Sequence, residues 1–166
     1  MPLGTGGGLK FAEAYIRSDP FLVLNGDTLL PGLDITMLKT THEQAYPLVS
    51  IAVTHIQATG PYGTIDFDRE HWIRAFYEKT EHRQGWVNGG VYLMDKKALA
   101  LIQPGKDVSL ETEFFPQLAT QGQLLAFPVP PPLLDMGTPE GLAAMERYFK
   151  NKAKDISHRE HREKRI

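Results

Sequence analysis

The distribution of apolar residues along the chain predicts strands alternating with helices. Residues 20–27 begin as an unbroken apolar run and end at Asn-Gly-Asp, and a run that is apolar on both alternating faces is typical of a central strand in a parallel sheet. Residues 47–54 alternate between apolar and polar side chains, which predicts a half-buried strand. Two short runs at 64–68 and 72–77 follow a Gly-Pro-Tyr-Gly turn and predict a hairpin of the kind that often forms a lid.

The first eight residues are rich in glycine, and Leu9, Ala12 and Ile16 follow them at helical spacing. We therefore expect a loop that leads into a helix. Such a loop lets backbone N–H groups approach a ligand closely at the positive end of the helix dipole. The glycine spacing matches neither the dinucleotide fingerprint nor the phosphate-binding P-loop, and no strand precedes it. The segment is thus either a ligand-binding loop or a flexible N-terminus.

Helical signals recur further along the chain. Asp34 is a suitable first residue for a short helix at 34–43, with Ile35 and Leu38 on one face. A proline and an early acid after Gly137 predict a long last helix. The buried stripe of that helix is expected to be Leu142, Met145 and Phe149. Further expected elements are a strand at 86–94 interrupted by glycines, a helix at 96–102, a helix capped by Ser109 and a strand at 124–129.

Composition narrows the class of protein. The 166 residues carry a formal net charge of −2, but residues 150–166 hold seven Lys or Arg against three acids. We expect one domain over residues 1–150 and a basic, disordered tail over 151–166. The acidic body argues against a nucleic-acid-binding surface. There is no cysteine, no apolar stretch long enough to span a membrane and no signal pattern, which predicts a cytoplasmic protein without disulfides.

Two acids lie at the ends of apolar segments. Asp27 follows the run at 21–24, and Asp135 follows Leu133 and Leu134. Ligands of open α/β sheets bind outside the carboxyl ends of strands, so each acid is a candidate metal ligand or catalytic group. Both acids also lie in sequences that favour turns, and turn formation alone would explain them. Lys79 similarly is either a solvent-facing cation or a point charge for a phosphate.

Taken together, these segments resemble the sugar-phosphate nucleotidyltransferase family over residues 2–150, and most closely the guanylyltransferases and uridylyltransferases that activate heptose, mannose or related sugar 1-phosphates. The matching motifs, in the order of the family, are Leu3-Gly4-Thr5-Gly6-Gly7, residues 21–27, Tyr62-Gly63-Thr64, Glu78-Lys79, residues 87–92, Ser109-Leu110-Glu111 and residues 134–140. The resemblance implies a Rossmann-like α/β three-layer sandwich with a mixed sheet and a small β lid.

The resemblance also implies a reaction. A sugar 1-phosphate oxygen attacks the α-phosphorus of a nucleoside triphosphate, with GTP favoured, and gives a nucleotide-sugar and pyrophosphate. Positioning and charge neutralisation supply most of the acceleration of such a displacement. Mg²⁺ suits this task, and by the resemblance Asp27 and Asp135 hold it. The expected acceptor is a manno-heptose or mannose 1-phosphate.

Roles for other residues carry over from the same motifs. Lys79 resembles the lysine that contacts the sugar phosphate, and Glu78 resembles the residue that contacts sugar hydroxyls. Asn88 and Gly89 resemble the sugar-binding turn, in a stretch where the family often has Asn-Ala-Gly, and Gly63 resembles the glycine before the lid strand. The base-facing contacts are expected from Gly4, Thr5, Gly6 and Gly7, while Glu111 receives no role.

The chain departs from the family at its start, because members have a strand, a triphosphate-binding loop and two further strands before the Leu-Gly-Thr-Gly-Gly motif. We therefore expect an N-terminally truncated domain with apolar surface and an unpaired sheet edge. A homo-oligomer, or another chain that supplies the missing segment, would complete the site. The alternative to an enzyme is a catalytically inactive fragment that acts as an oligomerising or sugar-phosphate-binding module. A generic α/β nucleotide-binding domain is less consistent with two strand-end carboxylates.

Overall fold

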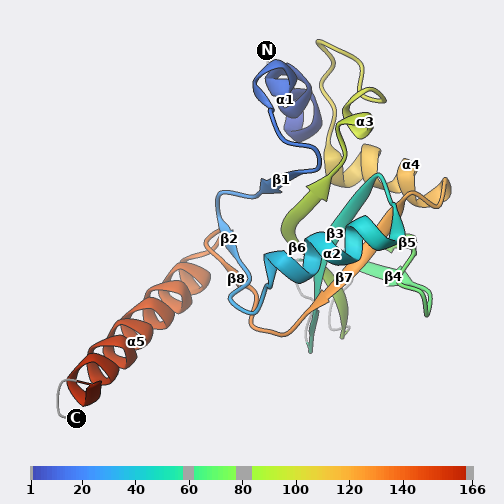
Figure 1. Cartoon of the computed structure of the whole chain (residues 1–166). Helices are drawn as coiled ribbons and strands as arrows, with labels where there is room; N and C mark the ends of the chain where they lie inside the picture. Colours follow the sequence, from blue (N-terminus) through green and yellow to red (C-terminus); the bar gives the residue numbers. More distant parts are fainter. Residues whose placement is uncertain (1, 58–61, 78–83, 164–166) are drawn as a thin grey trace.

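The structure is a computed structural model that describes residues 2–57, 62–77 and 84–163, with side chains described to residue 154 in the last helix (Figure 1). Its centre is a mixed sheet in the order β5-β4-β6-β3-β7, with β1 paired to β6. The strands of this sheet are β1 (Phe21–Leu24), β3 (Val49–Ile56), β4 (Thr64–Phe67), β5 (Ile73–Tyr77), β6 (Gly85–Met94) and β7 (Leu124–Val129). β3 runs parallel to β7 and antiparallel to β6. The predicted α/β class with a mixed sheet and a small hairpin, β4–β5, is confirmed.

Helices cover both faces of this sheet (Figure 1). The helical segments are α1 (Gly4–Ala12) with a 3₁₀ turn after it, α2 (Ile35–Ala45), α3 (Lys96–Leu99), the π-helical turn η2 (Leu110–Phe114), α4 (Phe115–Thr120) and α5 (Pro139–Glu163). Ile51 and Val53 of β3 belong to the larger core cluster, which includes Phe115, whereas Ala52 between them belongs to a smaller cluster. Because successive side chains of a strand point to opposite faces, these clusters lie on opposite sides of the sheet. None of the described helices combines the length and hydropathy needed to cross a membrane.

The central strand is β3, and the prediction of a central parallel strand at residues 20–27 is wrong. β1 covers Phe21–Leu24, runs antiparallel to β6 and has no other strand partner among the described residues. Leu24 is 60% exposed. A short apolar run indicates that both faces of a strand are in contact with the core, and Val23 and Leu22 do pack against the larger and the smaller core cluster. Such a run does not indicate how many strands pair with it.

β3 is buried on both faces, so the prediction of a half-buried strand at residues 47–54 is also wrong. Its polar residues Ser50 and Thr54 are 1% and 0% exposed. Thr54 Oγ1 donates to the backbone oxygen of Val129 at 2.9 Å, and Ser50 Oγ lies 2.8 Å from His42 Nδ1. Buried hydroxyls that are hydrogen-bonded escape most of the desolvation cost, so an alternating pattern does not by itself mean an exposed face.

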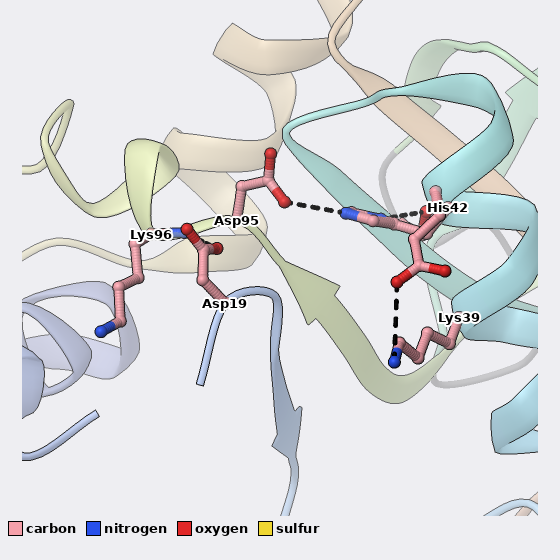
Figure 2. A network of polar contacts seen from close by, with 7 residues as sticks. Asp19, Lys39, His42, Asp95 and Lys96 are labelled. Atoms are coloured by element: carbon pink, nitrogen blue, oxygen red, sulfur yellow. Dashed lines mark hydrogen bonds and ion pairs between the residues drawn. The ribbon is translucent and has the colours of Figure 1, made fainter. Parts of the chain in front are cut away.

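His42 fastens α2 to the sheet (Figure 2). Its imidazole is 2% exposed, and Nε2 lies 3.1 Å from Asp95 Oδ1 just beyond β6. A Ser-His-Asp arrangement of this kind resembles a hydrolytic triad, but Ser50 is buried within a central strand and no substrate can reach it. The cluster therefore stabilises the fold. Leu38 shares the buried face of α2 with His42, whereas Ile35, expected on that face, is 54% exposed.

Three helices differ from their predicted limits, and the helix expected at 96–102 is shorter, because α3 ends at Leu99. Residues 4–8 are helical, so the glycine-rich segment is the first part of α1 and not a loop. α5 extends away from the body and continues to Glu163 (Figure 1). Of its expected buried stripe only Met145 is buried, while Leu142 and Phe149 are 47% and 53% exposed. The helix points away from the core after its first turns, so helical periodicity along it does not translate into burial. The division of the chain at residue 150 stays a prediction.

Candidate functional site

A two-stranded ribbon brings the two predicted carboxylates together. β2 (Thr28–Leu29) pairs antiparallel with β8 (Leu134–Asp135), and the register places Thr28 opposite Asp135. The backbone N–H of Met136 donates to the backbone oxygen of Asp27 at 2.8 Å. Asp27 and Asp135 are therefore neighbours across this ribbon, although they are 108 positions apart in the sequence (135 − 27).

Asp135 is held by donors on both of its oxygens. Oδ1 accepts a hydrogen bond from the backbone N–H of Gly137 at 2.7 Å, and Oδ2 accepts one from the Tyr62 hydroxyl at 3.0 Å. Partial burial, the hydrogen bond to Asp135 and the negative charges of Asp135 and Asp27 raise the pKa of Tyr62 to about 12. The phenol therefore stays protonated at neutral pH and acts as a donor, which fixes the plane of the Asp135 carboxylate.

The N-terminus of α5 lies directly against Asp135. A Cβ atom on Gly141 would overlap the backbone oxygen of Asp135, so only glycine permits this approach. Thr138 Oγ1 accepts from the backbone N–H of Gly141 at 3.1 Å and completes the start of the helix. The Gly137-Thr138-Pro139 sequence thus places the helix where it supports the carboxylate.

The donor chemistry of this pair fits a hard divalent cation. Among the described residues no group of three or more His, Cys, Asp or Glu side chains could hold a metal ion. Two carboxylates alone are nevertheless the protein contribution that Mg²⁺ usually takes, because substrate phosphates and water fill the remaining positions. Asp27 is exposed, and its Oδ1 accepts a hydrogen bond from Thr28 Oγ1 at 3.0 Å.

Two cavities adjoin the carboxylates. The larger, of about 830 Å³, is lined by Tyr62, Gly63, Asn88, Glu111 and Asp135 together with apolar residues of β4, β5 and α4. The smaller, of about 520 Å³, is lined by Thr5, Asn25, Asp27 and Glu111 with apolar residues of α1 and β1. Gly63 and Asn88, which were expected to face the sugar, thus lie on the larger cavity, and Thr5, which was expected to face the base, lies on the smaller one.

Gly4, Gly6 and Gly7 of α1 pack closely against residues 106–108 in this structure. The backbone N–H groups of Gly6 and Gly7 donate to the Val108 oxygen at 2.8 and 3.4 Å, and a Cβ on Gly7 would overlap the Lys106 oxygen. Gly4, Gly6 and Gly7 line neither cavity. Thr5 differs from them, because its hydroxyl accepts from the Leu110 N–H at 2.8 Å and faces the smaller cavity.

The residues expected to contact the sugar occupy different positions in the structure. Asn88 has a fixed amide, since Oδ1 accepts from the Gly90 N–H at 2.8 Å and Nδ2 donates to the Tyr92 hydroxyl at 3.0 Å. Gly89 is buried against Leu30 and Ala52 and lines neither cavity. Glu78 and Lys79 lie outside the described residues.

Glu111 is the site residue to which the sequence analysis assigned no role. It lines both cavities, and its carboxylate accepts bonds from hydroxyls of three separate segments. The available signal was its place in the Ser109-Leu110-Glu111 motif, which marked it without indicating what it contacts.

Comparison with known sequences identifies the family of this arrangement. The sequence model of the family described as nucleotidyl transferase matches residues 1–152. The chain belongs to this family. The resemblance stated from the motifs is thereby confirmed, and the paired carboxylates lie in a nucleotidyltransferase domain.

Individual relatives agree with this assignment. A mannose-1-phosphate guanylyltransferase of Mycobacterium tuberculosis is 33% identical over 142 residues, which are 84% of this chain and 39% of the relative. A D-glycero-alpha-D-manno-heptose 1-phosphate guanylyltransferase of Campylobacter jejuni is 34% identical over 95 residues, which are 57% of this chain and 40% of the relative. The chain therefore spans about two fifths of the length of these curated relatives.

The fold has solved counterparts as well. The crystal structure of HddC from Yersinia pseudotuberculosis superposes with a TM-score of 0.78 at 30% identity, over 90% of this chain and 64% of HddC. The same protein complexed with GMP-PN superposes with a TM-score of 0.76. This nucleotidyltransferase chain thus shares its described architecture with a protein that has been crystallised with a guanine nucleotide analogue.

Proposed function

We propose that this nucleotidyltransferase transfers a guanylyl group from GTP to a mannose or manno-heptose 1-phosphate, giving a nucleotide-sugar and pyrophosphate. The observation that carries the proposal is the β2–β8 ribbon, which sets Asp27, a lining residue of the smaller cavity, beside Asp135, a lining residue of the larger one. One cavity would take the nucleotide and the other the sugar 1-phosphate, with the carboxylates between the reacting phosphates.

In this reaction an oxygen of the sugar 1-phosphate forms a bond to the α-phosphorus, and the bond from that phosphorus to the pyrophosphate oxygen breaks. Asp27 and Asp135 would hold Mg²⁺, which when bound neutralises charge on the phosphates. Asn88 and Gly63 would orient the sugar, and Thr5 would face the nucleotide. Positioning of this kind supplies much of the acceleration of a nucleotidyl transfer.

The choice of donor and acceptor is supported by the relatives. Mannose 1-phosphate and manno-heptose 1-phosphate appear in the names of the guanylyltransferases from Mycobacterium tuberculosis and Campylobacter jejuni. The complex of HddC with GMP-PN supports a guanine nucleotide. The larger cavity also has room for a monosaccharide phosphate.

The test is pyrophosphate release by the folded chain with Mg²⁺, each of the four nucleoside triphosphates in turn, and both sugar 1-phosphates. We expect release with GTP, and its loss in Asp27→Asn and in Asp135→Asn. Asp66→Asn is the matched control, because Asp66 is exposed on β4 and lines neither cavity. Pyrophosphate release that survives both carboxylate substitutions contradicts the proposal. Release that is equally fast with every nucleoside triphosphate contradicts the choice of GTP as the donor.

A second candidate is an oligomerising or sugar-phosphate-binding module without catalysis. It is favoured by β1, whose second edge has no strand partner among the described residues and whose Leu24 is exposed. Sedimentation equilibrium separates the two proposals when it is combined with the assay above. A folded chain that self-associates and binds sugar 1-phosphate, yet releases no pyrophosphate, supports the module.

A further inference from the structure

Glu111 occupies the wall between the two cavities. It follows the N-cap Ser109, lies at the start of η2 and lines both the larger and the smaller cavity. Its side chain is half-buried, so its carboxylate is partly removed from water. A charge in this position needs donors from the protein, and the identity of those donors indicates what the residue does.

Three hydroxyl groups from different parts of the fold donate to this carboxylate. Oε2 accepts from Thr5 Oγ1 of α1 at 3.0 Å and from Ser109 Oγ at 3.2 Å. Oε1 accepts from the Tyr92 hydroxyl of β6 at 3.3 Å. Glu111 is thus bonded simultaneously to the helix beside the smaller cavity and to the strand beneath the larger one.

These bonds continue to a residue at each cavity. On one side, the Thr5 hydroxyl also accepts from the Leu110 N–H, so its donor proton is directed to Glu111. On the other side, the Tyr92 hydroxyl accepts from Asn88 Nδ2, which faces the larger cavity. Burial and the negative charge of Glu111 raise the pKa of Tyr92 well above its usual range, so this hydroxyl stays protonated and remains a donor.

We propose that Glu111 is a positioning residue that sets the nucleotide-facing Thr5 and the sugar-facing Asn88 in a fixed relation through one chain of hydrogen bonds, Thr5–Glu111–Tyr92–Asn88. The inference rests on the proposed function, because it takes the two cavities as the sites of the two substrates. Glu111→Gln keeps the size of the side chain but offers one acceptor oxygen and an NH₂ group. The substitution cannot accept from both Thr5 and Tyr92 as the carboxylate does.

The test is the affinity of Glu111→Gln, Tyr92→Phe, the double variant and a control variant for two probes. Calorimetry measures the binding of a nonhydrolysable GTP analogue and, separately, of mannose or manno-heptose 1-phosphate. We expect Glu111→Gln to weaken the binding of both probes by about tenfold, the equivalent of about 1.4 kcal/mol. Tyr92→Phe breaks the link to Asn88 and also removes the hydrogen bond of this hydroxyl with Asn25, which lines the smaller cavity. We therefore expect it to weaken sugar 1-phosphate more than the GTP analogue. In the double variant the sugar 1-phosphate affinity should be no weaker than in the worse single variant, because both substitutions break the same chain.

Glu113→Gln is the matched control. Glu113 is exposed two residues away, accepts from the Ser109 N–H at 2.9 Å and lines neither cavity. Wild-type affinity for both probes is expected in this variant, even if its melting temperature falls. This separates an effect on the start of η2 from an effect on the site.

Three results would overturn the inference. Unchanged affinity of folded Glu111→Gln for both probes would show that the residue only stabilises the fold, and additive losses in the double variant would show that Glu111 does not act through Tyr92. Both results leave the proposed function intact, since the wild-type chain still binds its probes. A folded wild-type chain that binds neither probe would remove the proposed function and this inference together.

Discussion

The buried His42 cluster offers a quantitative test of how α2 is held to the sheet. The substitution His42→Leu keeps an apolar side chain of comparable size but removes both ring nitrogens. Ser50 Oγ, in a residue that is 1% exposed, then loses its 2.8 Å contact to Nδ1, and no other hydrogen bond of this hydroxyl is found in the described part of the chain. An unsatisfied buried hydroxyl costs about 1–3 kcal/mol.

The loss on the other side of the ring is smaller. The side chain of Asp95 is 31% exposed, so water replaces the 3.1 Å contact to Nε2, and partly exposed pairs contribute roughly 0–1 kcal/mol. We therefore expect His42→Leu to lower the free energy of unfolding by about 2 kcal/mol. For a domain of this size that corresponds to a fall in melting temperature of about 4–8 °C.

The assay is urea denaturation followed by circular dichroism, with His42→Leu, Ser50→Ala and the double variant. Replacing both partners by apolar groups removes the unsatisfied hydroxyl, so the double variant should be more stable than His42→Leu alone. A double variant that is destabilised by the sum of the two single changes would refute this reasoning. It would show that the cost arises from packing around the ring and not from the hydroxyl of Ser50.

Three other substitutions test the surroundings of the carboxylates and α1. Tyr62→Phe removes the donor to Asp135 Oδ2 and should weaken Mn²⁺ binding by about tenfold, because loss of a supporting hydrogen bond to a metal ligand typically has this effect. Electron paramagnetic resonance measures the affinity for Mn²⁺ directly, and unchanged or tighter binding would contradict the prediction. Gly141→Ala places a methyl group against the Asp135 backbone and should cost about 1–3 kcal/mol in urea denaturation. Gly8 lies inside α1, and a Cβ atom there would meet no atom within 4 Å beyond the backbone of its own helix. Gly8→Ala should therefore stabilise the chain by up to about 1 kcal/mol, and a loss of stability would indicate that this helix is assembled differently.

Features governed by neighbouring residues could be read from the sequence. Asp34 caps α2 by accepting from the Met37 N–H at 3.0 Å, and Ser109 caps η2 by accepting from the Thr112 N–H at 3.2 Å. The hairpin β4–β5 formed where two short strand patterns followed a turn. In each case the partner lies a few residues away, so side-chain type and spacing contain the necessary information.

The order of the strands could not be read in this way. The apolar run at 21–24 predicted a central strand and the alternating run at 49–54 a half-buried one. Among the described residues, however, β1 pairs with β6 alone, and β3 is enclosed between β6 and β7. Burial of Ser50 and Thr54 depends on His42 and on the Val129 oxygen. A hydrophobicity pattern does not record partners that come from other elements.

The sequence by itself determined the family, through motifs in a fixed order, and it marked Asp27 and Asp135 as candidates for one site. Only the tertiary structure decided that these two acids are neighbours, because the pairing of β2 with β8 brings together two segments that are far apart in the sequence. It also decided that Gly4, Gly6 and Gly7 of α1 pack against residues 106–108 and that Glu111 lines both cavities. Side-chain chemistry is local to the sequence, whereas the distance between two functional groups is set by the packing of the whole domain.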